Sequence, residues 1–209
     1  MLTVDITKKL KNFLIEIQFE VDNEIVVLFG PSGSGKTTLL NCIAGLTHPD
    51  MGTISLNQQL FFHEHKKNIP VQKRNVGYLF QDYALFPHMT VEKNIHYGMK
   101  DLTLAEKLID VVGVRKLLDS YPRQISGGEK QRVALIRALA MKPDALLLDE
   151  PFSSLDANNR AECQDELIRL HQTWKIPVIM VTHDYNEAKK VGNRILRIET
   201  GKLHPEQIE

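Results

Sequence analysis

The chain has 209 residues; 43% of them are hydrophobic and 25% are charged, and 26 Lys and Arg residues balance 26 Asp and Glu residues. This length and composition are typical of a globular protein with one large domain, or with a core that carries an inserted subdomain. The net charge of zero weighs against a general nucleic-acid binder, which usually has a basic excess. No nucleic-acid partner is therefore expected.

No segment predicts membrane insertion or export. The longest apolar run, Ile25–Phe29, is far shorter than the roughly 20 residues that span a bilayer, and the N-terminus lacks a signal-peptide pattern. Cys42 and Cys163 form no C-x-x-C pair and are expected to be reduced and structural. The stretch 63–65, HEH, has no third metal ligand near it and is expected to be a polar loop. The chain is expected in the cytoplasm.

The first half of the sequence predicts strands around one helix. Apolar and polar residues alternate from Ile15 to Asp22, which indicates a half-buried strand. The stretch 24–30, EIVVLFG, is apolar on both faces, as a central parallel strand would be. A helix is expected over 36–46, a short strand within 48–61, and another strand over 75–81 that ends at Gln81.

The second half predicts a helical insertion followed by a return to α/β structure. Residues from about 82 to 141 have helical patterns and no matching strands. Buried strands are expected over 144–151 and 177–184, helices over 161–174 and 186–191, and a closing hairpin over 194–203. One domain over 1–209 is therefore predicted, with a core formed by 1–81 and 142–209.

Four of the predicted strands end in residues that handle phosphate or water. These strand ends carry the loop from Gly30, then Gln81, Asp149 with Glu150, and His183. In open α/β sheets, ligands bind beyond the carboxyl ends of the strands. The sequence therefore predicts one site at one edge of one sheet.

The loop after the first central strand has the spacing of a phosphate-binding loop. The sequence GPSGSGKT fits G-x-x-x-x-G-K-[ST] and lies between a predicted strand and a predicted helix. Glycines let successive N–H groups turn toward phosphate oxygens, and the helix adds its positive N-terminal end. Lys36 is expected to reach the β- and γ-phosphates, and the Thr37 hydroxyl to hold Mg²⁺. The predicted nucleotide-binding residues here are Gly30, Pro31, Ser32, Gly33, Ser34, Gly35, Lys36, Thr37 and Thr38.

Two acids and two single polar residues complete the predicted catalytic site. Asp149 is expected to bind Mg²⁺, and Glu150 to act as the general base toward the attacking water. Gln81 is expected near Mg²⁺ or the water, and His183 near the γ-phosphate. In isolation, the acids read as caps of the following segment, and Gln81 and His183 as structural residues; their shared position favours a catalytic role.

A second possible phosphate grip occurs at 125–132, ISGGEKQR. Taken alone, it is a helix start capped by Ser126. The alternative is that two copies pair head to tail, so that Ser126, Gly127 and Gly128 of each copy contact the γ-phosphate held by the other. Closed two-fold pairing of this kind is the commonest oligomer symmetry, and ATP hydrolysis would then loosen the pair.

With these motifs in this order, the sequence resembles the ATP-binding subunit of ATP-binding cassette (ABC) transporters over nearly its whole length. The matching motifs are the Walker A loop, Gln81, the ISGGEKQR signature, the Walker B stretch ALLLDEP, the SSLD stretch at 153–156, and His183 in VTHDYNEA. The signature has Ile125 where the family often has Leu. The resemblance implies an α/β fold with a P-loop NTPase core and mixed sheet, an N-terminal antiparallel β-subdomain and an inserted helical subdomain.

The resemblance also implies site residues and partners. Asp156 would contribute to nucleotide binding, and Phe13 would stack on adenine, although the loop KKLKNF departs from the common pattern. The implied partners are a second ATPase subunit, expected to be an identical copy, an integral-membrane permease and, indirectly, a solute-binding protein. Tyr83, Leu85 and Phe86 would lie near the permease groove, or else in the core. The implied location is peripheral, on the inner face of the cell membrane.

The direction of transport is suggested by a longer similarity. The stretch FQDYALFPHMTVEKNIHYGM is similar to importer subunits, and LKNFLIEIQFE favours molybdate-type ones. Since the sequence ends at Glu209, no C-terminal regulatory domain is expected. Alternatives are an exporter ATPase and a soluble ABC ATPase that acts on DNA or ribosomes; the short spacing between Lys36 and Ser126 weighs against the DNA-repair relatives. A P-loop kinase leaves the signature and His183 unexplained.

Overall fold

The computed structural model describes residues 1–66, 68–153, 155 and 157–204. Within these residues ten strands form one sheet, in the order β5-β4-β1-β2-β10-β9-β3-β8-β7-β6. The strands are β1 (Leu2–Lys9), β2 (Leu14–Val21), β3 (Ile25–Phe29), β4 (Met51–Leu56), β5 (Gln59–His63), β6 (Val76–Leu79), β7 (Ala145–Asp149), β8 (Val178–Thr182), β9 (Arg194–Glu199) and β10 (Lys202–His204).

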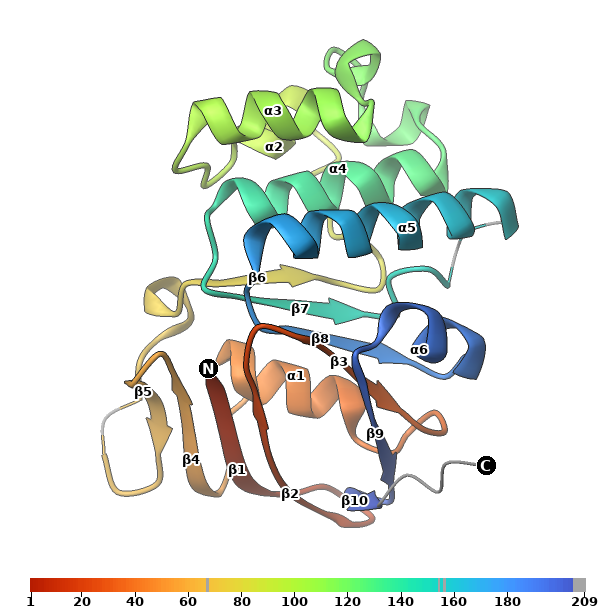
Figure 1. Ribbon diagram of the computed structural model, residues 1–209. Coiled ribbons are helices and arrows are strands. Elements are labelled where there is room, and N and C mark those ends of the chain that lie inside the picture. Colours follow the sequence, from red (N-terminus) through yellow and green to blue (C-terminus); the bar gives the residue numbers. More distant parts are fainter. Residues whose placement is uncertain (67, 154, 156, 205–209) are drawn as a thin grey trace.

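The position of a helix in the molecule depends on where it lies in the chain relative to β6 and β7 (Figure 1). Those between β6 and β7 form a layer at one end of the molecule, and α1 lies on the other side of the sheet from α4 and α5. The α-helices are α1 (Lys36–Ala44), α2 (Val91–His96), α3 (Leu102–Val112), α4 (Gly127–Ala140), α5 (Ala157–Trp174) and α6 (Tyr185–Val191). The 3₁₀ helices are η1 (Val71–Lys73), η2 (Arg115–Leu117) and η3 (Pro122–Gln124).

The sheet is mixed, as predicted. Strands β9, β3, β8, β7 and β6 pair in parallel, which brings the carboxyl ends of β3, β6, β7 and β8 to one edge. Strands β1, β2, β4 and β5 pair antiparallel at the other end of the sheet. The predicted α/β fold with an antiparallel N-terminal region is therefore observed.

The central strands are buried on both faces, because successive side chains point to opposite sides of the sheet and helices cover both sides. Ile25 and Val27 of β3 belong to the cluster that includes the helices α4 and α5, whereas Val26 and Leu28 belong to the cluster that includes α1. The first cluster also takes in side chains of α2 and α3, such as Ile95. The helical insertion therefore packs continuously onto the sheet without a separate hydrophobic core among the described residues.

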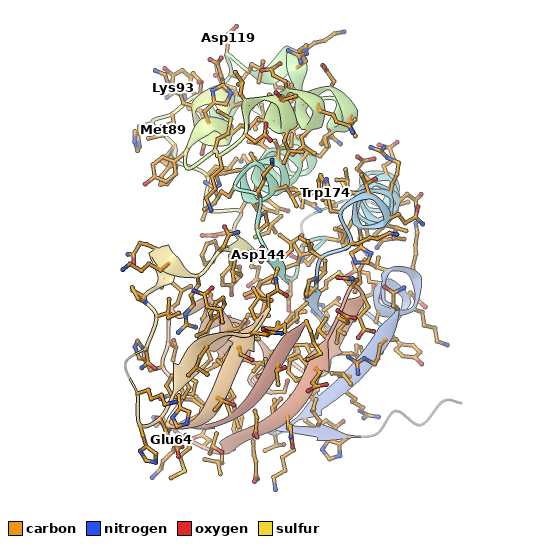
Figure 2. The ribbon with its side chains drawn as sticks, turned by 60° about the vertical axis from the view of Figure 1, so that its left-hand side comes forward. Glu64, Met89, Lys93, Asp119, Asp144 and Trp174 are labelled. Carbon is orange, nitrogen blue, oxygen red and sulfur yellow. The ribbon has the colours of Figure 1, made fainter. Side chains whose placement is uncertain are left out.

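The insertion and the antiparallel strands occupy opposite ends of the molecule. Figure 2 shows Lys93, Met89 and Asp119 at the helical end and Glu64, which follows β5, at the other. None of the described helices is long and apolar enough to cross a membrane.

Three local expectations differ from the structure. Strand β6 ends at Leu79, so Gln81 lies two residues beyond the strand. The single strand expected within 48–61 is a hairpin, because Asn57 and Gln58 adopt positive φ angles of 49° and 67°, as a type I′ turn requires. The helical pattern expected over about 82–141 is broken after α3, where Arg115–Leu117 form only the 3₁₀ turn η2.

Candidate functional site

The loop between β3 and α1 is curled by two glycines. Gly33 and Gly35 have φ angles of +81° and +103°, which residues with a side chain rarely adopt. A Cβ atom at Gly35 would lie 2.9 Å from Ile15 Cδ1, whereas nothing lies within 4 Å of the corresponding position at Gly33. Helix α1 begins at Lys36 with Gly35 as its N-cap and without a side-chain cap. Its first N–H groups are therefore available to an anion.

The amine of Lys36 lies inside this loop. Its Nζ donates to the carbonyl oxygens of Gly30 at 2.7 Å and Pro31 at 2.8 Å. The residue is 5% exposed, and no carboxylate forms an ion pair with it among the described residues. Burial lowers the pKa of Lys36, although Glu150 and Asp149 oppose this effect. The amine is thus a buried cation that neutral carbonyl groups hold in place.

The predicted metal-binding residues Thr37 and Asp149 are in contact. Thr37 Oγ1 donates to Asp149 Oδ1 at 3.2 Å. Burial raises the pKa of Asp149, the hydrogen bond from Thr37 lowers it, and the nearby Glu150 raises it again. Thr37, Asp149 and Gln81 line one hollow of about 720 Å³. Hydroxyl, carboxylate and amide oxygens are suitable ligands for Mg²⁺, so this set of three residues fits the predicted ion.

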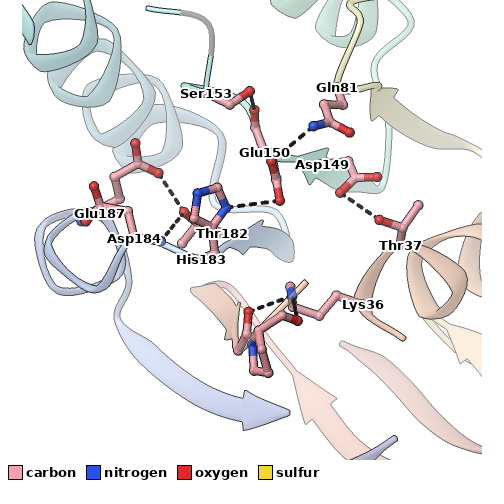
Figure 3. Close-up of polar contacts among 12 residues, drawn as sticks. Lys36, Thr37, Gln81, Asp149, Glu150, Ser153, Thr182, His183, Asp184 and Glu187 are labelled. Atoms are coloured by element: carbon pink, nitrogen blue, oxygen red, sulfur yellow. Dashed lines mark hydrogen bonds and ion pairs between the residues drawn. The ribbon is translucent and has the colours of Figure 1, made fainter. Parts of the chain in front are cut away.

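Glu150 lies between Gln81, which was predicted near Mg²⁺ or the attacking water, and His183, which was predicted near the γ-phosphate (Figure 3). Gln81 Nε2 donates to Glu150 Oε2 at 3.1 Å, and His183 Nδ1 lies 3.2 Å from Glu150 Oε1. The Glu150 backbone has a φ angle of +46°, which is uncommon for a residue with a side chain. Its N–H donates to the Val181 carbonyl at 3.0 Å, which fixes the turn after β7.

One cleft of about 350 Å³ is lined by all of these groups except Asp149, which lines the 720 Å³ hollow. Ser32, Gly33, Gly35, Lys36, Thr37 and Thr38 form one wall, and Gln81, Glu150 and His183 form the other. Leu10, which was not predicted, also lines it. The residues come from the loop after β3 and from the segments after β6, β7 and β8, as the strand-end pattern predicts.

The residues at the signature lie elsewhere. Ser126 caps α4: Glu129 N donates to Ser126 Oγ at 3.4 Å, and Ser126 N and Oγ both donate to Glu129 Oε2 at 2.7 Å. These bonds lower the pKa of Glu129. Ser126, Gly127 and Gly128 do not line the 350 Å³ cleft. Figure 1 shows that α4 nevertheless begins on the side of the molecule to which β6 and β7 point.

The predicted adenine platform lies close to the loop but not in the cleft. Phe13 is half-buried, and its Cε2 atom lies 3.5 Å from the Cβ position of Gly35. It is in the turn between β1 and β2, where Leu10 N donates to the Phe13 carbonyl at 2.9 Å. Leu10 is therefore the residue of this turn that faces the cleft. Asp156 and residue 154 of the SSLD stretch lie outside the described residues.

A second, apolar groove lies between the helical insertion and the core. It has a volume of about 460 Å³. Phe86, Tyr97 and Met141 line it on the helical side, and Leu46 and Val71 on the core side. Of the three residues implied for a permease groove, Phe86 lines it, whereas Tyr83 is 5% exposed and belongs to the core, against which Leu85 also packs.

The comparisons with known proteins identify the family. Residues 14–153 match the family described as ABC transporter, so the chain belongs to this family. The chain is 41% identical over 206 residues to the molybdenum import ATP-binding protein ModC of Shewanella sp. (strain MR-7), which covers 97% of the chain and 57% of that protein. It thus spans less than two thirds of the length of such relatives.

Two further proteins extend the comparison. The chain is 43% identical over 214 residues to the probable sulfate/thiosulfate import ATP-binding protein CysA of Chlorella vulgaris, with 97% of the chain and 89% of that protein covered. Its fold is similar to a dimeric, post-hydrolysis structure of the ATP-binding cassette MJ0796 bound to ADP and Pi, with a TM-score of 0.84, 28% identity and coverage of 99% and 98%. The predicted family and fold class are confirmed.

Proposed function

We propose that the chain binds and hydrolyses ATP and thereby powers solute import through a membrane permease. The observation that carries this proposal is the 350 Å³ cleft, where the phosphate-binding loop faces Gln81, Glu150 and His183. The similarity of the chain to molybdenum and sulfate import ATP-binding proteins supports an oxyanion as the solute. The proposed location is the inner face of the cell membrane.

Each residue in the cleft has a distinct task. The loop N–H groups and the start of α1 bind the phosphates. Lys36 exchanges its bonds with the Gly30 and Pro31 carbonyls for phosphate oxygens. Mg²⁺, held by Thr37 and Asp149 with Gln81 beside them, would neutralise negative charge on the phosphates. Glu150 accepts a proton from the attacking water, while Gln81 and His183 hold its two carboxylate oxygens in place.

Two copies are proposed to pair head to tail. The support is that Ser126, Gly127 and Gly128 do not line the cleft of their own chain, while the similar cassette MJ0796 is described as dimeric. In such a pair, the signature of each copy would contact the γ-phosphate held by the other. Asp156 and Phe13 keep their proposed contacts with the nucleotide.

The permease is proposed to insert a segment into the apolar groove. Leu46, Val71 and Tyr97 are 49%, 37% and 55% exposed there, so three large apolar side chains face solvent beside one another. Exposed apolar surface of this kind is typical of an interaction site.

The experiment that tests the function is a membrane pull-down of a tagged Glu150→Gln variant with ATP and Mg²⁺. A polytopic permease in the eluate, together with ATP hydrolysis by the wild-type chain, is the expected result. Lys36→Ala is the control, because it removes the phosphate-binding amine. Recovery of only ribosomal or DNA-repair proteins would instead support a soluble ABC ATPase.

The groove has its own test. Val71→Asp places a charge in the groove, away from the hollow that Thr37, Gln81 and Asp149 line, and is expected to abolish permease recovery while ATP hydrolysis by the isolated chain changes less than about threefold. Leu102→Asp is the matched control, because Leu102 is 56% exposed on α3 and does not line the groove. Equal permease recovery by both variants would remove the groove from the proposal.

A further inference from the structure

The ring of His183 is held by its backbone neighbours and not by packing. Its side chain is 57% exposed. On one side of it, Thr182 is 2% exposed and its Oγ1 donates to Glu187 Oε2 at 2.7 Å. On the other side, the Asp184 N–H donates to Thr182 Oγ1 at 3.1 Å, and Asp184 Oδ1 accepts from Asn186 N at 2.8 Å. The network around Thr182 and Asp184 therefore sets where the ring lies.

Arg160, in the first turn of α5, connects this network to another segment. Its Nη1 lies 3.8 Å from Asp184 Oδ2, and its Nε lies 3.6 Å from Glu187 Oε1. Its Nη2 donates to the Leu155 carbonyl at 3.1 Å. Only the contact with the Leu155 carbonyl is within hydrogen-bond distance; the two carboxylates lie at ion-pair distance from the planar guanidinium group, so one side chain lies among three partners.

Leu155 belongs to the loop that follows Glu150. Ser153 N donates to the Glu150 carbonyl at 3.3 Å, and Leu155 N donates to the Phe152 carbonyl at 3.2 Å. Leu155 is 5% exposed, so the side chain anchors this loop in the core. Arg160 therefore joins the loop after Glu150 to the residues on both sides of His183.

We propose that Arg160 is a positioning residue that keeps His183 in register with Glu150. The proposal rests on the proposed function, since it assigns Arg160 a part in ATP hydrolysis at the same site. Glu187 is 7% exposed, so the guanidinium also compensates a buried carboxylate. Burial raises the pKa of Glu187, and the neighbouring Arg160 lowers it. Without Arg160, the residues beside His183 lose their side-chain link to the Leu155 carbonyl, and only the Glu150 N–H bond to the Val181 carbonyl and the His183–Glu150 contact still join the two segments.

The structure offers a matched control. Lys190 of α6 connects this helix to α5: its Nζ lies 2.8 Å from Asp165 Oδ1 and donates to the Ala161 carbonyl at 3.4 Å. It contacts neither the loop after Glu150 nor the residues beside His183. Lys190→Met therefore removes an α5–α6 ion pair without touching the proposed connection.

The experiment is steady-state ATP hydrolysis with Mg²⁺ by Arg160→Met, Arg160→Lys, Lys190→Met, His183→Ala and the Arg160→Met/His183→Ala double variant. Arg160→Met is expected to lower kcat about 10- to 100-fold, as small misplacements of catalytic groups do, with KM for ATP changed less than about twofold. Arg160→Lys retains the charge without the fork and is expected to fall between. Lys190→Met is expected to match wild type.

The double variant separates positioning from stability. If Arg160 acts through His183, the double variant is expected to be no slower than His183→Ala alone, because the two losses are not additive. Additive losses, or equal effects of Arg160→Met and Lys190→Met, would overturn the proposal. Absence of Mg²⁺-dependent hydrolysis in the wild-type chain would instead overturn the proposed function.

Discussion

The phosphate-binding loop and the start of α4 look alike in sequence and differ in structure. Both combine hydroxyl residues with glycines before a helix. At the loop, no side chain caps α1, and Lys36 is a buried cation. At α4, Ser126 and Glu129 satisfy each other in a capping box. The first region leaves the N–H groups at its helix start without a side-chain partner, whereas the second has already paired its cap.

The acids of the two regions show this difference most directly. Burial raises the pKa of Asp149, so the folded chain opposes its charge. Hydrogen bonds from Ser126 lower the pKa of Glu129, so the folded chain favours its charge. A cation bound beside Asp149 would relieve an existing cost. A phosphate bound at Ser126 would have to share a hydroxyl that Glu129 already occupies, so within one chain the signature is the weaker of the two phosphate sites.

The largest effect on ATP hydrolysis is expected from a substitution at the site of the phosphate-binding loop, away from the start of α4. Glu150→Gln is expected to lower ATP hydrolysis about 10²- to 10⁴-fold, because it removes the general base, while ATP binding and the paired form persist. Steady-state hydrolysis and size-exclusion chromatography with ATP measure both. Glu92→Gln in α2 serves as control. Wild-type hydrolysis by the variant would remove Glu150 from the mechanism.

An intermediate effect is expected at the second region. Ser126→Arg places a long cation where the other copy would approach, so ATP-dependent dimers are expected to disappear while the monomer still binds ATP. Sedimentation with and without ATP measures the pairing, and nucleotide titration measures the binding. Thr103→Arg adds the same charge to an exposed position of α3 and is expected to pair normally. Persistent dimers in Ser126→Arg would refute the head-to-tail arrangement.

The smallest effect sharpens the comparison through stability. Asp149→Asn removes a buried charge and is expected to raise the Tm of the nucleotide-free chain at pH 7 by about 2–4 °C, as about 1 kcal/mol does at this size. Since the raised pKa means that the folded state holds the proton more tightly, the gain shrinks as pH falls through that pKa. Glu129→Gln is the opposite-sign control: its Tm is expected to be lower at pH 7, and the deficit to shrink as pH falls through the lowered pKa of Glu129. A lower Tm for Asp149→Asn would contradict the burial argument.

The sequence predicted the site where local patterns were sufficient. The loop GPSGSGKT and the acids at the end of β7 are each contiguous in the sequence, and parallel strands end at a common edge, so their meeting at one edge of the sheet followed from the pattern of buried strands. Positive φ angles at residues other than glycine could not be predicted from the residue type in the same way. The hairpin turn at Asn57 and Gln58 was missed because Gln is an uncommon turn residue.

Contacts between distant segments were harder to predict. The sequence suggested either the permease groove or the core for Tyr83, Leu85 and Phe86; Phe86 lines the apolar groove, whereas Tyr83 belongs to the core cluster and Leu85 packs against it. The sequence likewise gave no reason to select Leu10 or Arg160. Both act through tertiary geometry, and neither belongs to a recognisable motif.

The left-handed backbone at Glu150 has a practical consequence. A φ angle of +46° suits glycine better than any residue with a Cβ atom, so Glu150→Gly is expected to relax the turn while removing the carboxylate. Laboratory evolution for heat resistance alone would therefore collect changes at this position that abolish turnover. Selection schemes for this chain need to score the proposed ATP hydrolysis together with survival at high temperature.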